Sequence, residues 1–345
     1  MYLQISNIPS TTHCSLSQEG SILLALLPIP HKAKSLDNKT ETCHNALLYH
    51  SVLNLVLSSL RETARDGVQL DCADGWIQWC FPILQTWIAD FLEQCKLTLC
   101  KQNRCPRCIV PIRLRGEYLK DEHAATLAIR ESCDVRRCIK EGEDVEDTLG
   151  VKPWQNVLWY FPRVELYDLP RTDILHTFLL GILDHIMNWT SAFLRKHHCL
   201  QLFDSIWCTF PPYPGFIVPT RTFLQVKQWQ GDEFRSFAKV FVIAVALALR
   251  NPKTEIERED FPTCLQCCRS LISFIQYARL PRHTPTTLHL MEEHLLRFHE
   301  SKKVFLEFRA GIKARTEAAE LGRDMRMEEK AKPPAPMSRT QKQVR

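Results

Sequence analysis

Cys105 and Cys108, in the segment CPRC, have the spacing of a metal-binding pair. Two thiolates separated by two residues can both reach one Zn²⁺ ion, which prefers a tetrahedral set of sulfur and nitrogen ligands. Buried thiols without a metal are the alternative interpretation of a single pair. We expect this pair to provide half of a structural zinc site.

The other half of the site would come from nearby residues of the right type. His123, Cys133 and Cys138 follow the pair and are the expected ligands. Cys95 and Cys100 lie just upstream and form an alternative pair of thiols. The sequence alone leaves the choice between them open.

Asp173 and His176 are three residues apart, which places both side chains on one face of a helix, where they could act together. In the structural interpretation, Asp173 is the N-cap of that helix and His176 is partly buried and hydrogen-bonded locally.

Two other groups of residues have a plain structural interpretation. Cys264, Cys267 and Cys268 lie inside a helical apolar pattern, where small polarizable side chains usually belong to the core. Trp229 could stack on a nucleic-acid base beside Lys227, but core packing is the expected role.

Composition excludes several classes of protein. Of the 345 residues, 45% are hydrophobic and 24% are charged, as in globular chains, and the 11 glycines form no phosphate-binding loop. The longest apolar run, residues 240–249, is too short to cross a bilayer, and residues 1–20 contain no Lys or Arg and no apolar signal segment. We expect an intracellular protein without a membrane span, whose 15 cysteines are reduced.

Positive charge is concentrated at the C-terminal end. Residues 301–345 contain 12 Lys and Arg against 6 Asp and Glu, so this segment has a charge of +6. Residues 1–300 have a charge of −1, and the whole chain therefore has a net charge of +5. Such a segment suits phosphate contacts, although a solvated helical face looks the same. The candidate DNA-binding residues are Lys302, Lys303, Arg309, Lys313 and Arg315.

A few strands precede many helices along the chain. Short apolar runs predict strands at residues 2–8, 21–30 and 68–73, and helical spacing predicts a helix over 43–64 that Gly67 ends. A long helix is expected to begin with Thr172 or Asp173 as its cap, followed by a proline-rich loop over 210–219. Further helices are expected at 232–250, 261–280 and 285–315. This order predicts an α+β fold with a large helical C-terminal portion.

Several segments, read in order, resemble the transposases of the Plavaka type, which are fungal members of the Kyakuja/Dileera/Zisupton superfamily of DNA transposons. The resemblance extends from Met1 to about residue 315, and its carrying segments are 66–95, 105–108, 169–189, 210–216, 225–236 and 291–309. It implies a ribonuclease-H-like mixed sheet whose carboxylates hold two Mg²⁺ ions for cleavage and transfer of DNA strands. It also implies a Cys-rich insert, which favours the zinc interpretation of CPRC.

The resemblance assigns catalytic roles to particular residues. Asp90 matches the second catalytic carboxylate, with Asp74 as competitor, and Leu92 stands where relatives commonly have proline. Glu233 matches the third carboxylate, with Asp232 as its neighbour. In the resembling transposases an Asp-x-x-His element lies beside the catalytic centre, which gives Asp173 and His176 a supporting role.

The first catalytic Asp of such enzymes would lie upstream of the strand at 2–8, and Asp37 does not occupy that position. We therefore expect a sheet incomplete at its N-terminal edge and a catalytically inactive, transposase-derived protein that binds transposon ends in the nucleus, with homo-oligomerisation possible. The alternative is a zinc-stabilised helical interaction module without DNA chemistry. The expected parts are a catalytic core over 1–94, the insert over 95–168, a helical region over 169–318 and a basic disordered tail over 319–345.

Overall fold

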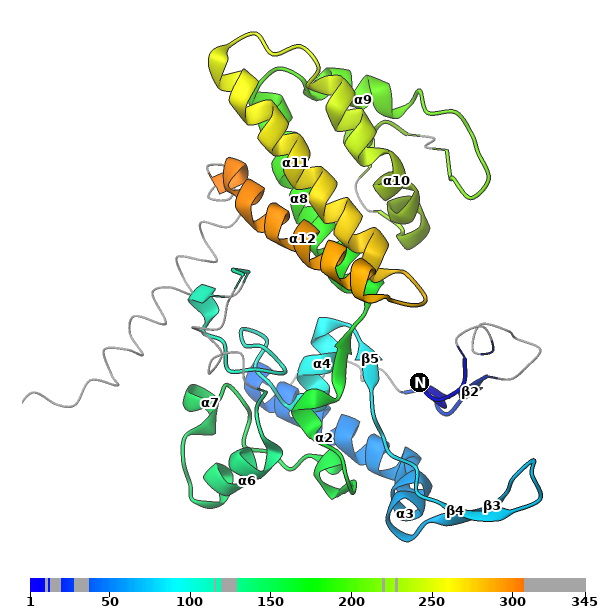
Figure 1. Ribbon diagram of the computed structural model, residues 1–345. Helices are drawn as coiled ribbons and strands as arrows, with labels where there is room; N and C mark the ends of the chain where they lie inside the picture. The colour runs from blue at the N-terminus through cyan, green and yellow to red at the C-terminus, as the bar shows by residue number, and fades with distance from the viewer. Residues whose placement is uncertain are drawn as a thin grey trace, which may run out of the picture. The chain divides into compact units, whose positions relative to one another are not determined.

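The computed structural model describes residues 1–9, 12, 20–27, 37–114, 116–118, 129–218, 221–226 and 229–306. The chain divides into two units (Figure 1). Unit 1 comprises residues 1–181 and 278–288, and unit 2 comprises residues 182–277 and 289–345. The expected insert over 95–168 therefore belongs to the same unit as the expected core over 1–94.

Unit 1 combines short strands with helices. Its principal elements are β1 (Tyr2–Gln4), β2 (Ser21–Leu23), α2 (Asn38–Val56), α3 (Ser58–Asp66), β3 (Val68–Asp71), β4 (Ile77–Cys80), β5 (Trp87–Ala89), α4 (Phe91–Thr98), η2 (Ile112–Leu114), α6 (Ser132–Lys140), α7 (Val145–Thr148), η4 (Val157–Tyr160), η5 (Leu166–Asp168) and β6 (Pro170–Thr172). The π-helix η6 (Ile174–Leu183) follows β6 and runs across the boundary between the units.

Unit 2 is helical in its described residues. Its elements are α8 (Asp184–Lys196), α9 (Leu200–Trp207), η7 (Phe223–Gln225), α10 (Gly231–Ala248), α11 (Glu255–Ala278), α12 (Pro285–Ser301), whose first turn belongs to unit 1, and η8 (Lys302–Phe305). Residues 211–218 form an irregular connection, as the prolines of that segment predict.

The strands form three two-stranded sheets. β1 pairs with β2 and β3 with β4 in antiparallel fashion, whereas β5 and β6 are parallel. Among the described residues these pairs are not joined into a single mixed sheet, so the ribonuclease-H-like fold stays a prediction. The α+β order of short strands followed by helices is present.

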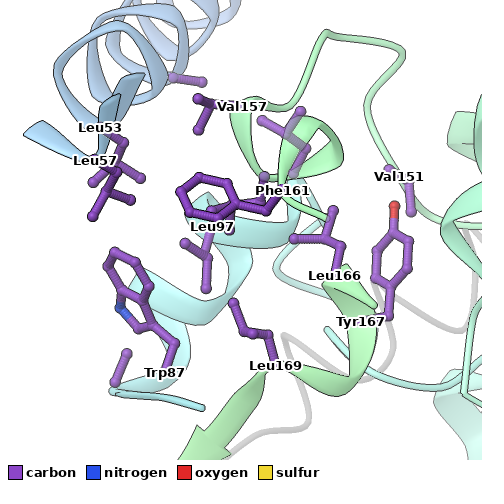
Figure 2. Packing of buried hydrophobic residues seen from close by; sticks show 14 of the residues in the cluster. Leu53, Leu57, Trp87, Leu97, Val151, Val157, Phe161, Leu166, Tyr167 and Leu169 are labelled. Atoms are coloured by element: carbon purple, nitrogen blue, oxygen red, sulfur yellow. The ribbon is translucent and has the colours of Figure 1, made fainter. Parts of the chain in front are cut away.

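The core of unit 1 lies between α2, α4 and the segment that follows α7. Leu53 and Leu57 face Leu97, and Trp87 of β5 lies close to Leu169 (Figure 2). Residues from the expected insert, among them Val135, Val151, Val157, Phe161 and Leu166, complete the same cluster. Because its apolar side chains fill this core, the segment 95–168 is a structural part of unit 1.

The helix predicted over 43–64 is divided into α2 and α3 at Leu57. Asp37 caps α2 by accepting hydrogen bonds from the amides of Lys39 and Thr40. Gly67 ends α3 with a positive φ of 80°, and a Cβ atom there would lie 2.8 Å from the Phe81 ring. Gly67 is thus required both by its backbone conformation and by the close approach of the ring.

The helix predicted after Asp173 begins as a π-helix, η6, and becomes α-helical only at Asp184. A Cβ atom on Gly181 would lie 2.8 Å from the carbonyl oxygen of His176, five residues earlier. Glycine therefore permits the close approach of backbone that the wider helix brings at this point. The apolar spacing of the segment fits both helix types, and this is why the sequence predicted a regular α-helix.

Helix α11 begins six residues before the predicted start at 261. The Thr254 hydroxyl accepts a hydrogen bond from the Glu257 amide, and the Glu257 carboxylate accepts one from the Thr254 amide. This capping box starts the helix upstream of Pro262, which α11 accommodates in its interior. The predicted start was wrong because residues 255–260 are mostly polar and the apolar pattern begins at Phe261.

The apolar run over 240–249 forms the second half of α10. Val240, Phe241, Ala244 and Val245 are buried, whereas Ile243 and Leu247 are exposed. Within the described part of the chain, no helix has the length and apolar character needed to cross a membrane.

Candidate functional site

The parallel pair β5 and β6 brings two predicted site residues to one sheet edge. Trp87 pairs with Pro170, Ile88 with Arg171 and Ala89 with Thr172. Asp90 and Asp173 each follow directly after the last paired residue, so both lie at the carboxyl ends of neighbouring strands. In α/β proteins this edge is a common place for ligand binding.

Asp90 is the N-cap of α4. Its Oδ1 accepts a hydrogen bond of 2.8 Å from the Glu93 amide, and the residue has extended backbone geometry. Leu92 is the second residue of the helix, a position where proline is also tolerated because the amide there needs no helical partner. Leu92, where the resemblance leads us to expect proline, is therefore compatible with the cap at Asp90.

Asp173 is the cap of η6, as its position in the sequence predicted. Its carboxylate accepts hydrogen bonds of 3.0 Å from the amides of both Leu175 and His176, and the His176 Nδ1 contacts the same carboxylate. Partial burial acts to raise the pKa of Asp173, but these hydrogen bonds outweigh it and hold the pKa below its ordinary value. His176 is exposed rather than partly buried, so the expected burial of its ring was wrong.

Glu233 lies in the first turn of α10 in unit 2, whereas Asp90 and Asp173 lie in unit 1. Its Oε2 accepts a hydrogen bond from the Gln230 amide, and its Oε1 lies 3.4 Å from the Arg221 guanidinium. Asp232 pairs with Arg235 at 2.9 Å. The local contacts of both acids are those of a helix start.

The competing carboxylate Asp74 lies in the turn between β3 and β4, where its Oδ1 accepts a hydrogen bond from the Trp76 amide. The strands on either side of this turn, β3 and β4, pair with each other, whereas β5 pairs with β6. Between the two candidates, only Asp90 follows a strand that pairs with the strand before Asp173.

Cys105 and Cys108 lie in a turn that brings their thiols into hydrogen-bonding contact. The Cys108 thiol, and then the amides of Cys108 and Arg107, donate hydrogen bonds that lower the pKa of Cys105, against the opposing effect of burial. The Cys108 amide nitrogen is 3.5 Å from the Cys105 sulfur. Hydrogen bonds of this kind favour a thiolate, the form that binds metal.

Arg130 adds a positive charge near the two thiols. It is only 4% exposed, its Nε donates to the Leu149 carbonyl, and its charge helps to lower the pKa of Cys105. The hydrogen bond to Cys105 and burial outweigh the same charge at Cys108 and raise the pKa of that thiol. Among the described residues no carboxylate forms an ion pair with it, and its Nη1 has no hydrogen-bond partner. A buried cation needs a compensating anion, and a thiolate here would supply one.

The remaining predicted zinc ligands are placed differently. Cys133 and Cys138 lie on α6, where a separation of five residues turns their side chains about 140° apart. Cys133 is exposed and contacts Glu131, whereas Cys138 is buried. This helix therefore does not present the two thiols side by side.

Cys100 is nearer to the CPRC turn, because its thiol donates to the Cys105 carbonyl oxygen at 3.2 Å. Cys95 is buried on α4. His123 lies outside the described residues. Within the described ranges, no group of three or more His, Cys, Asp or Glu side chains has an arrangement that could hold a metal ion.

The packing of unit 2 agrees with the expected core roles of the three cysteines of α11 and of Trp229. Cys264, Cys267 and Cys268 are fully buried on α11, and Cys268 lies 3.5 Å from the Thr190 hydroxyl of α8. The Trp229 ring packs against several aromatic rings, those of Trp207, Phe223, Phe234 and Phe237. Lys227, the neighbouring residue in the base-stacking interpretation, lies outside the described residues.

Two of the five candidate DNA-binding residues are described. Lys302 and Lys303 begin η8, the 3-10 helix that continues α12. Arg309, Lys313 and Arg315 lie outside the described residues, as do the last residues of the chain.

Strand β6 and the contacts made by Gln94 were not found by sequence reasoning. β6 contains only Pro170, Arg171 and Thr172, and a three-residue strand has no alternation to detect. Its one signal is Pro170, since proline is tolerated at the first position of a strand. Gln94 lies on α4 and contacts both strands, which no local pattern indicates.

A comparison with protein families matches residues 1–190 to the family described as Plavaka transposase. The matched segment contains β5, β6, Asp90, Asp173 and the CPRC turn, and it makes up more than half of the chain. No curated protein and no solved structure matches the chain.

Proposed function

The chain belongs to the Plavaka transposase family, and we propose that it is a transposase-derived DNA-binding protein that holds a divalent cation at the β5–β6 edge and no longer cleaves DNA. The observation that carries this proposal is the position of Asp90 and Asp173 at the ends of paired parallel strands. A protein with this role would act in the nucleus.

The donor set at this edge suits Mg²⁺ or Mn²⁺. These hard cations prefer oxygen ligands, and Mg²⁺ is commonly held by one or two carboxylates together with phosphate oxygens and water. When bound, the cation supplies positive charge that neutralises phosphate oxygens. Asp90 and Asp173 would hold it, while backbone amides orient one oxygen of Asp90 and both oxygens of Asp173.

Loss of cleavage is proposed from the number of carboxylates that follow the paired strands. Glu233, the third candidate acid, caps α10 and pairs with Arg221. Cleavage by two metals needs ligands for a second cation. The described residues bring two carboxylates to this edge, which is sufficient for one cation bound together with DNA phosphate.

The test measures Mn²⁺ binding by electron paramagnetic resonance and DNA binding by fluorescence anisotropy on the full chain. We expect Asp90→Asn and Asp173→Asn each to weaken Mn²⁺ binding at least about 10-fold, because each removes a charged oxygen ligand. Asp74→Asn, which changes an exposed carboxylate in the β3–β4 turn, should leave it unchanged. Affinity for duplex DNA should fall linearly with salt on logarithmic axes.

Three results would contradict the proposal. They are Mn²⁺ binding that neither Asp variant alters, absence of DNA binding at low salt, and Asp90-dependent cleavage of DNA in the presence of Mg²⁺ or Mn²⁺. The third result alone would leave DNA binding and the cation site in place and would remove only the proposed loss of activity.

The second candidate function is a zinc-stabilised interaction module. It is favoured by one observation, namely that backbone amides and the buried Arg130 charge support a thiolate at Cys105. The donor chemistry of Cys105 and Cys108 fits Zn²⁺, which would link the CPRC turn to further ligands and stabilise unit 1.

We expect Cys105→Ser to weaken zinc binding more than about 10-fold, since changes to outer-shell partners alone already have effects of this size. Zinc bound per chain, measured by mass spectrometry of the metal after dialysis, checks this result. Cys133→Ser is the matched control and should retain zinc, because Cys133 is exposed on α6 and directed toward Glu131. Equal zinc content in the wild type and Cys105→Ser would exclude the site, and stable zinc without DNA affinity would favour the second function over the first.

A further inference from the structure

Gln94 links the two strands that carry Asp90 and Asp173. It lies on α4, is 4% exposed, and its Nε2 donates hydrogen bonds to two backbone carbonyl oxygens. One is that of Ala89 in β5 at 2.7 Å, and the other is that of Arg171 in β6 at 3.0 Å. Both partners can only accept, so the amide nitrogen must face them and the orientation of the amide is fixed.

The two strands that Gln94 links are short, and the sheet that they form is small. Each contains three residues, they form a sheet of only two strands, and such a pair is marginally stable by itself. The backbone hydrogen bond from Trp87 to the Leu169 carbonyl, at 2.9 Å, lies at the opposite end of the pair. The contacts of Gln94 therefore join the strands at the end where the carboxylates follow.

The linked carbonyls are close to the carboxylates in the chain. Ala89 directly precedes Asp90, and Arg171 lies two residues before Asp173. The backbone N–H of Gln94 donates a hydrogen bond of 2.9 Å to the backbone carbonyl oxygen of Asp90 at the start of α4. A shift of either strand relative to α4 would break one of these hydrogen bonds and change the separation of the two carboxylates.

We propose that Gln94 is a positioning residue that sets the separation of Asp90 and Asp173 for a shared divalent cation. This inference rests on the proposed cation site at the β5–β6 edge. Gln94 does not contact the cation. It acts through the two strand carbonyls, so its loss changes cation affinity while the rest of unit 1 stays folded.

The test replaces Gln94 in the full chain and measures Mn²⁺ affinity by electron paramagnetic resonance, with helical content and melting temperature recorded for each variant. Gln94→Met keeps the length of the side chain and removes both hydrogen bonds. Gln94→Glu keeps its shape but has at most one proton to donate, so it cannot link both strands. We expect both variants to weaken Mn²⁺ binding about 10-fold.

Thr98→Val is the matched control. Thr98 is buried on the same helix, and its hydroxyl donates a hydrogen bond to the Gln94 carbonyl within α4. This variant removes a buried hydrogen bond, so it should lower the melting temperature and leave Mn²⁺ affinity unchanged. If the role of Gln94 were purely structural, its variants would behave like Thr98→Val, with a lower melting temperature and an unchanged Mn²⁺ affinity.

The outcomes separate this inference from the function on which it rests. If Asp90→Asn weakens Mn²⁺ binding but folded Gln94→Met and Gln94→Glu bind within about 2-fold of the wild type, well below an outer-shell effect, the positioning role is overturned and the cation site stands. If Mn²⁺ binding does not depend on Asp90, both are overturned.

Discussion

Replacement of Phe237 by alanine is expected to lower the free energy of unfolding of unit 2 by about 3 to 5 kcal/mol, the largest effect of any single change considered for this protein. Phe237 lies on α10 and is fully buried. Its ring contacts five other aromatic rings, those of Trp207, Phe223, Trp229, Phe234 and Phe241, at centroid distances of 4.8 to 6.1 Å. Its removal would leave a cavity among large rigid rings that cannot easily close.

Urea unfolding followed by tryptophan fluorescence measures this change, because Trp207 and Trp229 lie in the same cluster. Hydrogen exchange of peptides from α9 and α10 assigns the effect to unit 2. Ile243→Ala on the same helix is the matched control, and it should cost less than about 1 kcal/mol because Ile243 is exposed. A loss below about 1.5 kcal/mol for Phe237→Ala would show that the cluster is not packed as described.

Unit 1 is expected to lose stability as the pH falls from about 6.5 to about 4, because burial lowers the pKa of His50 from 6.5 to about 4. Its Nε2 lies 3.1 Å from the Lys96 carbonyl, which can only accept, so this nitrogen carries the proton of the neutral ring. The buried Nδ1 has no hydrogen-bond partner among the described residues. Protonation would place a second N–H and a charge there without compensation.

The sign follows from which state binds the proton first. The unfolded chain takes up a proton near pH 6.5, whereas the folded chain resists until about pH 4. Stability is therefore complete above the unfolded pKa, falls by up to about 3 kcal/mol across this range, and does not change further from this group at lower pH.

His50→Gln is the variant that isolates this effect, because glutamine can still donate to the Lys96 carbonyl but does not titrate. The difference in unfolding free energy between the wild type and His50→Gln should fall steadily from pH 7 to pH 4 in urea titrations. A difference that stays constant over this range would mean that the ring is accessible to protons in the folded protein.

Sequence reasoning located most of the helices because their signals are local. The cap at Asp173, the end of α3 at Gly67, the irregular segment at 211–218 and the buried face of α10 all depend on residues close together in the chain. Where prediction failed, another local arrangement with the same pattern was present. The π-helix has the apolar residues of an α-helix, and the capping box at Thr254 starts α11 ahead of Pro262.

The candidate site could be predicted only in part. Asp90 came from the resemblance, and Asp173 and His176 came from their spacing as well as from the resemblance. The sequence did not indicate that Asp90 and Asp173 follow paired strands. The thiols of Cys133 and Cys138 have a suitable spacing in the sequence, but α6 turns them apart. Spacing predicts that two residues bind one metal ion only when the secondary structure between them is known.

The amino-acid sequence by itself determined the family, the α+β order of elements and which acids and thiols could take part in chemistry. The tertiary structure alone decided that residues 95–168 complete the core of unit 1, that Asp90 and Asp173 share a sheet edge, and that Gln94 joins the strands beneath them. The reason is physical. Caps and apolar periodicity involve neighbours within a few residues, whereas Gln94 and Arg171 are 77 residues apart and meet only when the core has formed.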